Sequence, residues 1–238
     1  MGEGGWRGLH GRRLARTIAV VAGCAAFRWA CFAGMILLSL IAEARAAPRV
    51  PDLVLDSIPY VEVVNHWNYW LWVAAYFPLG FVLLFLSPGR FSRFMVTCGI
   101  LSLLRGACVL FTGLGPTLGA DLNTVRLAEP GMLWTAFREL LDPIGVLGRH
   151  SAHLYLTKDM FFSGHTSTTL NLLLYLWPWR RLRYAMLTLH LLVVASLFLG
   201  HIHYTIDVVG AWAITFAVYA LIEGFPGICP RRPATGGR

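Results

Sequence analysis

Two short motifs place two histidines and a carboxylate where apolar stretches of the chain begin or end. The motifs are Ser163-Gly164-His165-Thr166 and His203-Tyr204-Thr205-Ile206-Asp207. Because His203 and Asp207 are four residues apart, a helix would place them on one face, about 6 Å apart along its axis. The carboxylate can then accept a hydrogen bond from one imidazole nitrogen, which leaves the other nitrogen to attack an electrophile or to carry a proton.

Metal binding and a purely structural role are the alternatives for these residues. The four side chains that could ligate zinc are His165, His201, His203 and Asp207. His-x-His is a metal-binding spacing, but Arg105 is expected at the same level and would repel a cation. We therefore predict no metal ion and no organic cofactor. His165 could also be a plain helix-start residue and His203 a structural partner of Asp207, but the two motifs together favour catalysis, with His201 at the interface.

The composition indicates an integral membrane protein. Hydrophobic residues make up 57% of the 238 residues and charged residues only 13%, with a mean hydropathy of +0.61. A soluble domain carries roughly twice that charged fraction. The net charge of +8 does not indicate nucleic-acid binding, because Lys158 is the one lysine and the arginines cluster beside apolar segments. None of the five cysteines forms a Cys-x-x-Cys pair, so we expect no disulfide framework.

Six apolar segments have roughly the length that the hydrocarbon core of a membrane requires. They span residues 18–42, 68–87, 94–113, 164–178, 184–201 and 205–223. The first resembles a signal peptide because Ala44-Arg45-Ala46-Ala47 looks like a cleavage site, but it is long for one, and Arg28, which we expect to pack between spans, interrupts it. We predict an all-α, polytopic bundle of six transmembrane helices over residues 18–223, between a flexible N-terminus (1–17) and a C-terminal tail (224–238).

The arginines predict the orientation of these spans. Twelve of them lie in the termini or in two of the loops: Arg7, Arg12, Arg13, Arg16, Arg90, Arg93, Arg180, Arg181, Arg183, Arg231, Arg232 and Arg238. With six spans all twelve fall on one side, which the positive-inside bias makes cytoplasmic. Residues 43–67 and 114–163, with most of the acidic side chains, would face outside.

This orientation brings the polar residues together at the outer interface. Span four starts there near His165, and spans five and six meet there near His203 and Asp207. Arg105 lies in span three towards the same face; a buried arginine needs an anionic partner, and its planar fork suits a phosphate. Gly164 would let the backbone approach that phosphate, and the N–H groups that open span four favour an anion. The set indicates phosphoryl transfer.

Other polar and aromatic residues have structural interpretations. Asp159 either contacts substrate or orients its loop, and the alternative for Arg105 is an ion pair with a carboxylate at the outer face. His150 and His153 flank a predicted interfacial helix over residues 131–147. The tryptophans expected to form belts at the membrane interfaces are Trp67, Trp70, Trp72, Trp134 and Trp177.

Longer stretches around the two motifs resemble the sphingomyelin synthase family, a lipid phosphotransferase branch related to the type-2 phosphatidic acid phosphatases. Residues 159–166, Asp-Met-Phe-Phe-Ser-Gly-His-Thr, are similar to the family's Asp-x-x-aromatic-Ser-Gly-His-Thr. Residues 201–209 are similar to its His-x-His-Tyr-Thr-x-Asp-Val. Shorter matches to its third-helix segment and to the segment after its first helix lie at Arg93-Phe94, Gly99, Arg105, Thr112, Pro51-Asp52 and Asp56. The resemblance covers about residues 50–215.

The resemblance implies a six-helix fold of the phosphatidic-acid-phosphatase type and an enzyme active at the exoplasmic face. Such an enzyme transfers phosphocholine or phosphoethanolamine from a glycerophospholipid to ceramide or a related lipid alcohol. By this resemblance His203 is the nucleophile, Asp207 orients it, and His165 is the general acid and base. The residues expected to bind the phosphate or the substrate are Arg105, Asp159, Ser163, Gly164 and Tyr204.

The chain departs from these relatives at informative positions. Residue 202 is Ile, where family members often carry an acidic residue. The Lys-x6-Arg-Pro motif of the phosphatase branch is missing, and Ser196-Leu197 stands in place of its Ser-Arg pair. Fewer cations suit a singly charged phosphodiester better than a phosphate monoester, which favours the transferase. A lipid phosphate phosphatase and a non-catalytic lipid-binding membrane protein are the alternatives, although a binding protein has no need of two titrating histidines.

Overall fold

The computed structural model describes residues 6, 10–119, 121, 123–142 and 156–224. Within these residues every regular element is a helix, so the all-α prediction is confirmed for the described part of the chain. The elements are α1 (Arg12–Glu43), the 3-10 helix η1 (Leu55–Ser57), α2 (Glu62–Leu86), α3 (Pro88–Phe111), α4 (Asn123–Leu127), α5 (Met132–Leu141), α7 (Gly164–Leu176), α8 (Arg180–Leu199) and α9 (Thr205–Glu223).

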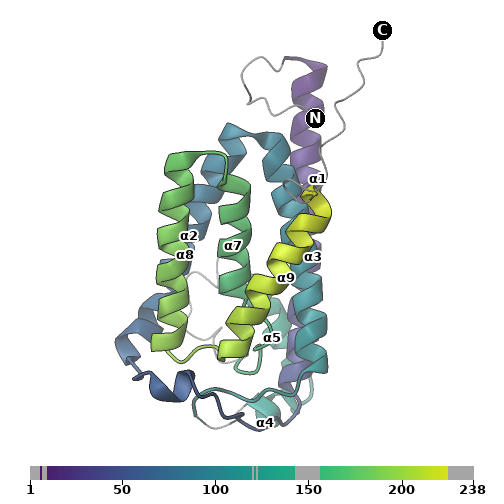
Figure 1. Cartoon of the computed structure of the whole chain (residues 1–238). Helices are drawn as coiled ribbons and strands as arrows, with labels where there is room; N and C mark the ends of the chain where they lie inside the picture. The colour runs from purple at the N-terminus through teal and green to yellow at the C-terminus, as the bar shows by residue number, and fades with distance from the viewer. Residues whose placement is uncertain (1–5, 7–9, 120, 122, 143–155, 225–238) are drawn as a thin grey trace.

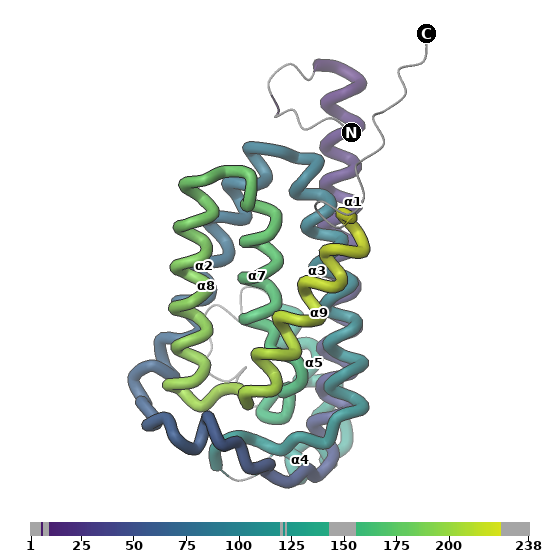
Figure 2. Tube along the Cα trace, viewed as in Figure 1, coloured from purple at the N-terminus to yellow at the C-terminus, as the bar shows by residue number. Residues whose placement is uncertain are grey.

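The long helices form one bundle in which successive members run in alternating directions (Figure 1, Figure 2). Short turns join α2 to α3 and α7 to α8 at one end, where α1 starts and α9 ends. The longer connections lie at the opposite end, together with η1, α4 and α5. We call this opposite end the loop end. His203 and the first turn of α9 lie there, so the predicted grouping of the motifs at one end of the bundle follows from the topology.

Among the described residues, five helices are long and apolar enough to cross a membrane, namely α1, α2, α3, α8 and α9, which indicates an integral membrane protein. The predicted fourth span, 164–178, corresponds to α7, which has only 13 residues and ends at Leu176. A helix of that length reaches about 20 Å, whereas the hydrocarbon core is about 30 Å thick. The count of six spans therefore stays a prediction.

Most helices begin before the predicted apolar segment. α1 starts at Arg12, inside the N-terminus that we predicted to be flexible, and α2 starts at Glu62. α3 starts at Pro88, with Ser87 accepting a hydrogen bond from the Arg90 N–H, which is a favourable helix start. Hydropathy detects only the apolar part of a helix, whereas the helical backbone hydrogen bonds continue through its polar first turns.

The interfacial helix predicted over residues 131–147 is only partly described. α5 covers Met132–Leu141, and its exposed Trp134 and buried Ala136 show the two faces of an amphipathic helix. Residues 143–155, including His150 and His153, lie outside the described residues.

α1 and α3 lie side by side in the same direction. Gly99 faces Phe27, and a Cβ on Gly106 would lie 2.9 Å from the Cα of Met35, so these glycines let the two backbones approach closely. Close packing through small residues is a principal stabilising contact between helices in a membrane. The pairing fixes the height of Arg105, which neighbours Gly106 on α3.

Residues 156–163 enter the bundle from the loop end and lead directly into α7. We call this segment the lead-in loop. Its buried residues are Lys158, Asp159, Met160, Phe162 and Ser163. Irregular backbone at membrane depth is tolerated where protein surrounds it. The lead-in loop supplies the length that α7 lacks and carries polar groups towards the histidines.

Candidate active site

His203 and Asp207 form a hydrogen-bonded pair at the start of α9. His203 Nδ1 lies 3.1 Å from Asp207 Oδ2, and the Asp207 side chain is fully buried. The same oxygen accepts a hydrogen bond of 2.9 Å from the backbone N–H of Tyr204. A carboxylate in the first turn of a helix is stabilised by the cap N–H and by the helix dipole. Because Asp207 engages Nδ1, Nε2 is the His203 nitrogen left to act on a substrate.

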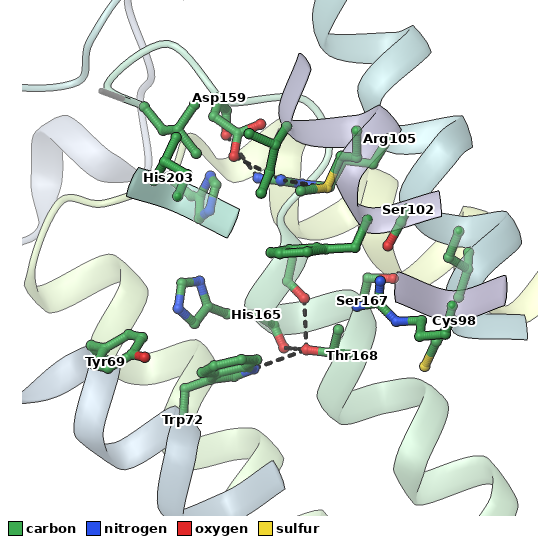
Figure 3. A pocket seen from close by; sticks show the side chains of 18 of the residues that line it. Tyr69, Trp72, Cys98, Ser102, Arg105, Asp159, His165, Ser167, Thr168 and His203 are labelled. Carbon is green, nitrogen blue, oxygen red and sulfur yellow. Dashed lines mark hydrogen bonds and ion pairs between the residues drawn. The ribbon is translucent and has the colours of Figure 1, made fainter. Parts of the chain in front are cut away.

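His165 lies opposite His203, on the first turn of α7 (Figure 3). The two ring centroids are 6.4 Å apart, with an interplanar angle of 62°. Ser163 caps α7, since its Oγ accepts a hydrogen bond from the Thr166 N–H. Its own N–H donates to the Asp207 carbonyl at 3.1 Å, which ties the start of α7 to the start of α9. The two histidines are thus held at a separation that one phosphorus atom could bridge.

Arg105 lies at the same end of the site and holds the lead-in loop. Its Nη1 forms an ion pair with Asp159 Oδ2 at 2.7 Å, and its Nε and Nη2 donate to the carbonyls of Phe162 and Asp159 at 2.6 and 3.0 Å. Ser39 Oγ donates to the other carboxylate oxygen of Asp159 at 3.1 Å. A Cβ on Gly164 would lie 3.2 Å from the guanidinium carbon of Arg105, so this glycine leaves room for the arginine. The structure therefore has the ion pair that was the alternative, and phosphate contact by Arg105 stays a prediction.

Lys158, the other cation near this end, is also engaged. Its Nζ donates to the Arg45 carbonyl, to Asp121 Oδ2 and to Thr124 Oγ1 at 2.7, 2.8 and 2.7 Å. An ammonium has three donors, so all of them are used. Burial alone would raise the pKa of Asp121, but the hydrogen bonds from Lys158 and Thr124 outweigh it and hold that pKa below its ordinary value of 3.8.

Glu43, which the sequence analysis did not single out, fixes the start of the lead-in loop. It is the last residue of α1 and is fully buried. Its carboxylate accepts hydrogen bonds from the N–H groups of Thr157 and Lys158 at 2.9 and 2.8 Å and from Asn123 Nδ2 at 2.8 Å. An acidic residue at the end of an apolar segment was the available sequence signal.

Asp52 caps α9 from the connection between α1 and α2. Its two carboxylate oxygens accept hydrogen bonds from the Thr205 N–H at 2.6 Å and from Thr205 Oγ1 at 2.8 Å. The N–H groups of Leu55 and Val54 also donate to it. Burial would raise the pKa of Asp52, but these hydrogen bonds outweigh it and hold the pKa below 3.8. The cap steadies the turn that carries His203.

Two of the residues considered for the site point elsewhere. The Tyr204 hydroxyl donates to the Gly115 carbonyl at 3.1 Å and accepts from the Val50 N–H at 3.2 Å, so only its backbone N–H serves the site. His201 Nε2 lies 2.9 Å from the Ile58 carbonyl oxygen.

Among the described His, Cys, Asp and Glu side chains, no three gather as they would around a metal ion.

A cavity of about 500 Å³ extends from the histidines into the bundle. Its polar end is lined by His165, His203, Arg105, Asp159 and Gly164. Apolar side chains of α1, α2 and α5 form most of the remaining wall. α1 packs on α3 and α5, whereas α2 packs on α3, α7 and α8, so the cavity lies between α1 and α2. A lipid chain could occupy such a space.

We predicted Trp72 to lie in an interface belt, but in the structure it lines this cavity. Its ring meets the His165 ring edge-on with centroids 5.2 Å apart, and its Nε1 donates to Thr168 Oγ1 at 2.9 Å (Figure 3). The other belt tryptophans are exposed: Trp67, Trp70, Trp134 and Trp177. The spacing of Tyr69, Trp72 and Tyr76 places all three on one helix face, which was the missed signal.

Comparison with known families adds to this geometry. Residues 158–224 match the family model described as PAP2 superfamily C-terminal. The match runs from the lead-in loop to the end of α9 and so includes His165, His203 and Asp207. No curated protein matches the chain. Over these residues the chain is similar to the PAP2 superfamily, whose members are typically phosphatases or phosphotransferases.

Proposed function

We propose that this protein is a lipid phosphotransferase of the sphingomyelin synthase type. It would move phosphocholine or phosphoethanolamine from a glycerophospholipid to ceramide or a related lipid alcohol. The observation that carries the proposal is the buried His203–Asp207 pair facing His165, with the two histidine ring centroids 6.4 Å apart, at the polar end of a cavity with mostly apolar walls. These are a nucleophile with its orienting carboxylate and a separate acid–base group.

The first displacement releases diacylglycerol. His203 Nε2 attacks the donor phosphorus, while Asp207 holds the Nδ1 proton and stabilises the cation that forms on the ring. The bond from phosphorus to the glycerol oxygen breaks, and His165 gives that oxygen a proton. The product on His203 is a singly charged phospho-histidine that still carries the head group.

The second displacement forms the new lipid. His165 removes the proton of the acceptor hydroxyl, whose oxygen attacks the phospho-histidine, and the phosphorus–nitrogen bond breaks. His203 and His165 return to their starting states. General acid and base catalysis by His165 contributes roughly 10²–10⁴ to the rate in each step.

Transfer is favoured over hydrolysis by the state of the cations near the histidines. A lipid phosphate monoester brings a charge near −2, whereas a phosphodiester brings −1. Arg105 and Lys158 already serve the lead-in loop and Asp121. The apolar walls also suit an incoming lipid alcohol better than water. Lipid phosphate phosphatase activity is the alternative.

The proposal also specifies which side of the membrane the site faces. With six spans the loop end, and with it the site, would face the exoplasmic side, and both termini would be cytoplasmic. The turns opposite the loop end carry the arginine-rich sequence Arg180-Arg181-Leu182-Arg183, which supports this orientation by the positive-inside bias.

The deciding experiment is a transfer assay on the purified protein in lipid vesicles. Phosphatidylcholine or phosphatidylethanolamine labelled in the head group is supplied with ceramide, and products are identified by mass spectrometry. We expect the label on ceramide and an equal amount of diacylglycerol, with His203→Ala as the inactive control. Free phosphate from phosphatidic acid, without any ceramide product, would establish the phosphatase instead.

A further inference from the structure

The far end of the cavity holds an arginine that the proposed reaction does not use. Arg28 lies midway along α1 and lines the cavity. Its Nη1 is buried and has no hydrogen-bond partner among the residues that the structure describes. The guanidinium lies 5.3 Å from the centroid of the Phe32 ring and beside the Tyr76 hydroxyl and the Cys98 thiol. These neighbours are uncharged, and none of the described carboxylates forms an ion pair with Arg28.

A cation at this depth is costly unless something balances it. Ionisable side chains inside a membrane usually face a cavity or an interior pathway, and they mark function by default. A buried nitrogen donor without an acceptor also loses the hydrogen bond that water would provide. Arg28 lines the cavity and its buried Nη1 lacks an acceptor, which indicates that a cavity occupant supplies an acceptor oxygen.

The position of Arg28 relative to the histidines limits which oxygen this is. Met35, whose sulfur lies 3.5 Å from Arg105 Nη1, is about two helical turns, or roughly 10 Å, further along α1. Along α2, the Trp72 ring centroid lies 5.2 Å from that of His165 and 5.4 Å from that of Tyr76, a neighbour of Arg28. Arg28 thus lies towards the middle of the bundle from the site. A lipid whose phosphorus lies at the histidines extends its backbone and acyl linkages in this direction.

We infer that Arg28 forms a subsite for the carbonyl oxygen of an acyl linkage in the bound lipid. The carbonyl is an ester in a glycerophospholipid donor and an amide in a ceramide-like acceptor. An uncharged acceptor fits better than a second phosphate, because a single guanidinium nitrogen lacks an acceptor and the surrounding wall is apolar. The inference rests on the proposed function in that a phospholipid or its acceptor occupies the cavity.

The test compares lipids that differ in that oxygen alone. Diacyl phosphatidylcholine and its dialkyl ether analogue share head group and chains, but the analogue has no carbonyl. Equilibrium binding of each lipid is measured on purified His203→Ala protein, which cannot turn over. We expect the diacyl lipid to bind roughly ten- to a hundredfold more tightly, the range for a hydrogen bond from a charged donor. Ceramide and its N-alkyl analogue form a second arm, which identifies whether the donor, the acceptor or both use the subsite.

Arg28→Met identifies the residue responsible. Added to His203→Ala, it is expected to lower diacyl affinity to that of the ether lipid and to leave ether affinity unchanged. Arg16→Met, an exposed arginine on the same helix, is the matched control and should retain the preference. Methionine replaces a cation with an apolar side chain of similar length, so membrane insertion is not impaired.

Two results would overturn the subsite. One is equal affinity of the Arg28-containing protein for carbonyl-bearing and carbonyl-free lipids in both arms, which needs no Arg28 variant to fold. The other is an equal loss of affinity for ester and ether lipids in Arg28→Met, which would make the residue structural. Binding without any head-group transfer by the protein with His203 intact would defeat the proposed function alone, so the two failures are distinguishable.

Discussion

Ser163 and Asp207 join the two histidine motifs directly, because the N–H of Ser163 donates to the backbone carbonyl of Asp207 at 3.1 Å. A second link lies further along the same helices, where Thr215 Oγ1 donates to Ser167 Oγ at 2.8 Å. The separation of His165 and His203 is therefore set by the α7–α9 contact and not by the mobile ends of side chains. A site built on rigid elements can hold two reacting groups at a fixed distance.

Asp207→Asn is expected to lower kcat by roughly 10³- to 10⁴-fold, because an amide cannot hold the His203 tautomer or stabilise the ring cation. The measurement is head-group transfer by purified protein, with size-exclusion chromatography as the check on folding. Glu62→Gln, at an exposed carboxylate on α2, is the control and should behave as the unmodified protein. Unchanged kcat in Asp207→Asn would remove the orienting role, and loss of monodisperse protein would make the residue structural.

Arg105→Met is expected to destabilise the protein by about 3–5 kcal/mol, because it leaves the Asp159 carboxylate buried without its partner. The double variant Arg105→Met with Asp159→Leu removes both charges and should recover the part of that loss due to the unpaired carboxylate, but not the hydrogen bonds from Arg105 to the carbonyls of Phe162 and Asp159. Thermal unfolding in detergent gives the stabilities, and the transfer assay gives activity. A stable but inactive double variant would support phosphate contact by Arg105, whereas a stable and active one would limit the pair to holding the loop.

Asp52→Asn is expected to lower stability at neutral pH by about 1–2 kcal/mol, because asparagine brings no charge to the start of α9 and has one acceptor oxygen where Asp52 uses two. The pKa of Asp52 is lowered by folding, so its contribution is complete above 3.8 and is lost as the pH falls through the lower folded value. Melting temperatures of both proteins, measured from neutral pH downwards, should converge only below pH 3.8. Convergence at a higher pH would contradict the prediction. Asp56→Asn, at an exposed surface pair, is the control with little expected effect.

Cysteine labelling is expected to place Leu53 outside and Arg181 in the cytoplasm. Leu53 is 91% exposed at the loop end, and Arg181 is exposed in the first turn of α8 at the other end. Single cysteines at these positions, introduced after replacing the five native cysteines, would be probed with a membrane-impermeant reagent on intact cells. Labelling of position 181 but not 53 would reverse the topology and move the donor lipid to the cytoplasmic leaflet.

The local features of this protein were readable from the sequence alone. Hydropathy located the five long helices, and α9 was predicted over the residues that form it, 205–223. The pairing of His203 with Asp207 also follows from a local rule, because residues four apart on a helix share a face whatever surrounds them. Sequence patterns succeed where the cause of a structure lies within a few residues.

Tertiary structure decided the partners of the polar groups. The partner of Arg105 is Asp159 and that of Lys158 is Asp121. Both pairs arise because the lead-in loop enters the bundle from the loop end and brings Lys158 and Asp159 to these partners. Tyr204 points out of the site towards the Gly115 carbonyl, and Trp72 points into it towards the His165 ring. A hydrogen-bonding group takes whichever acceptor the packing of distant segments brings within about 3 Å, and no spacing along the chain encodes that choice.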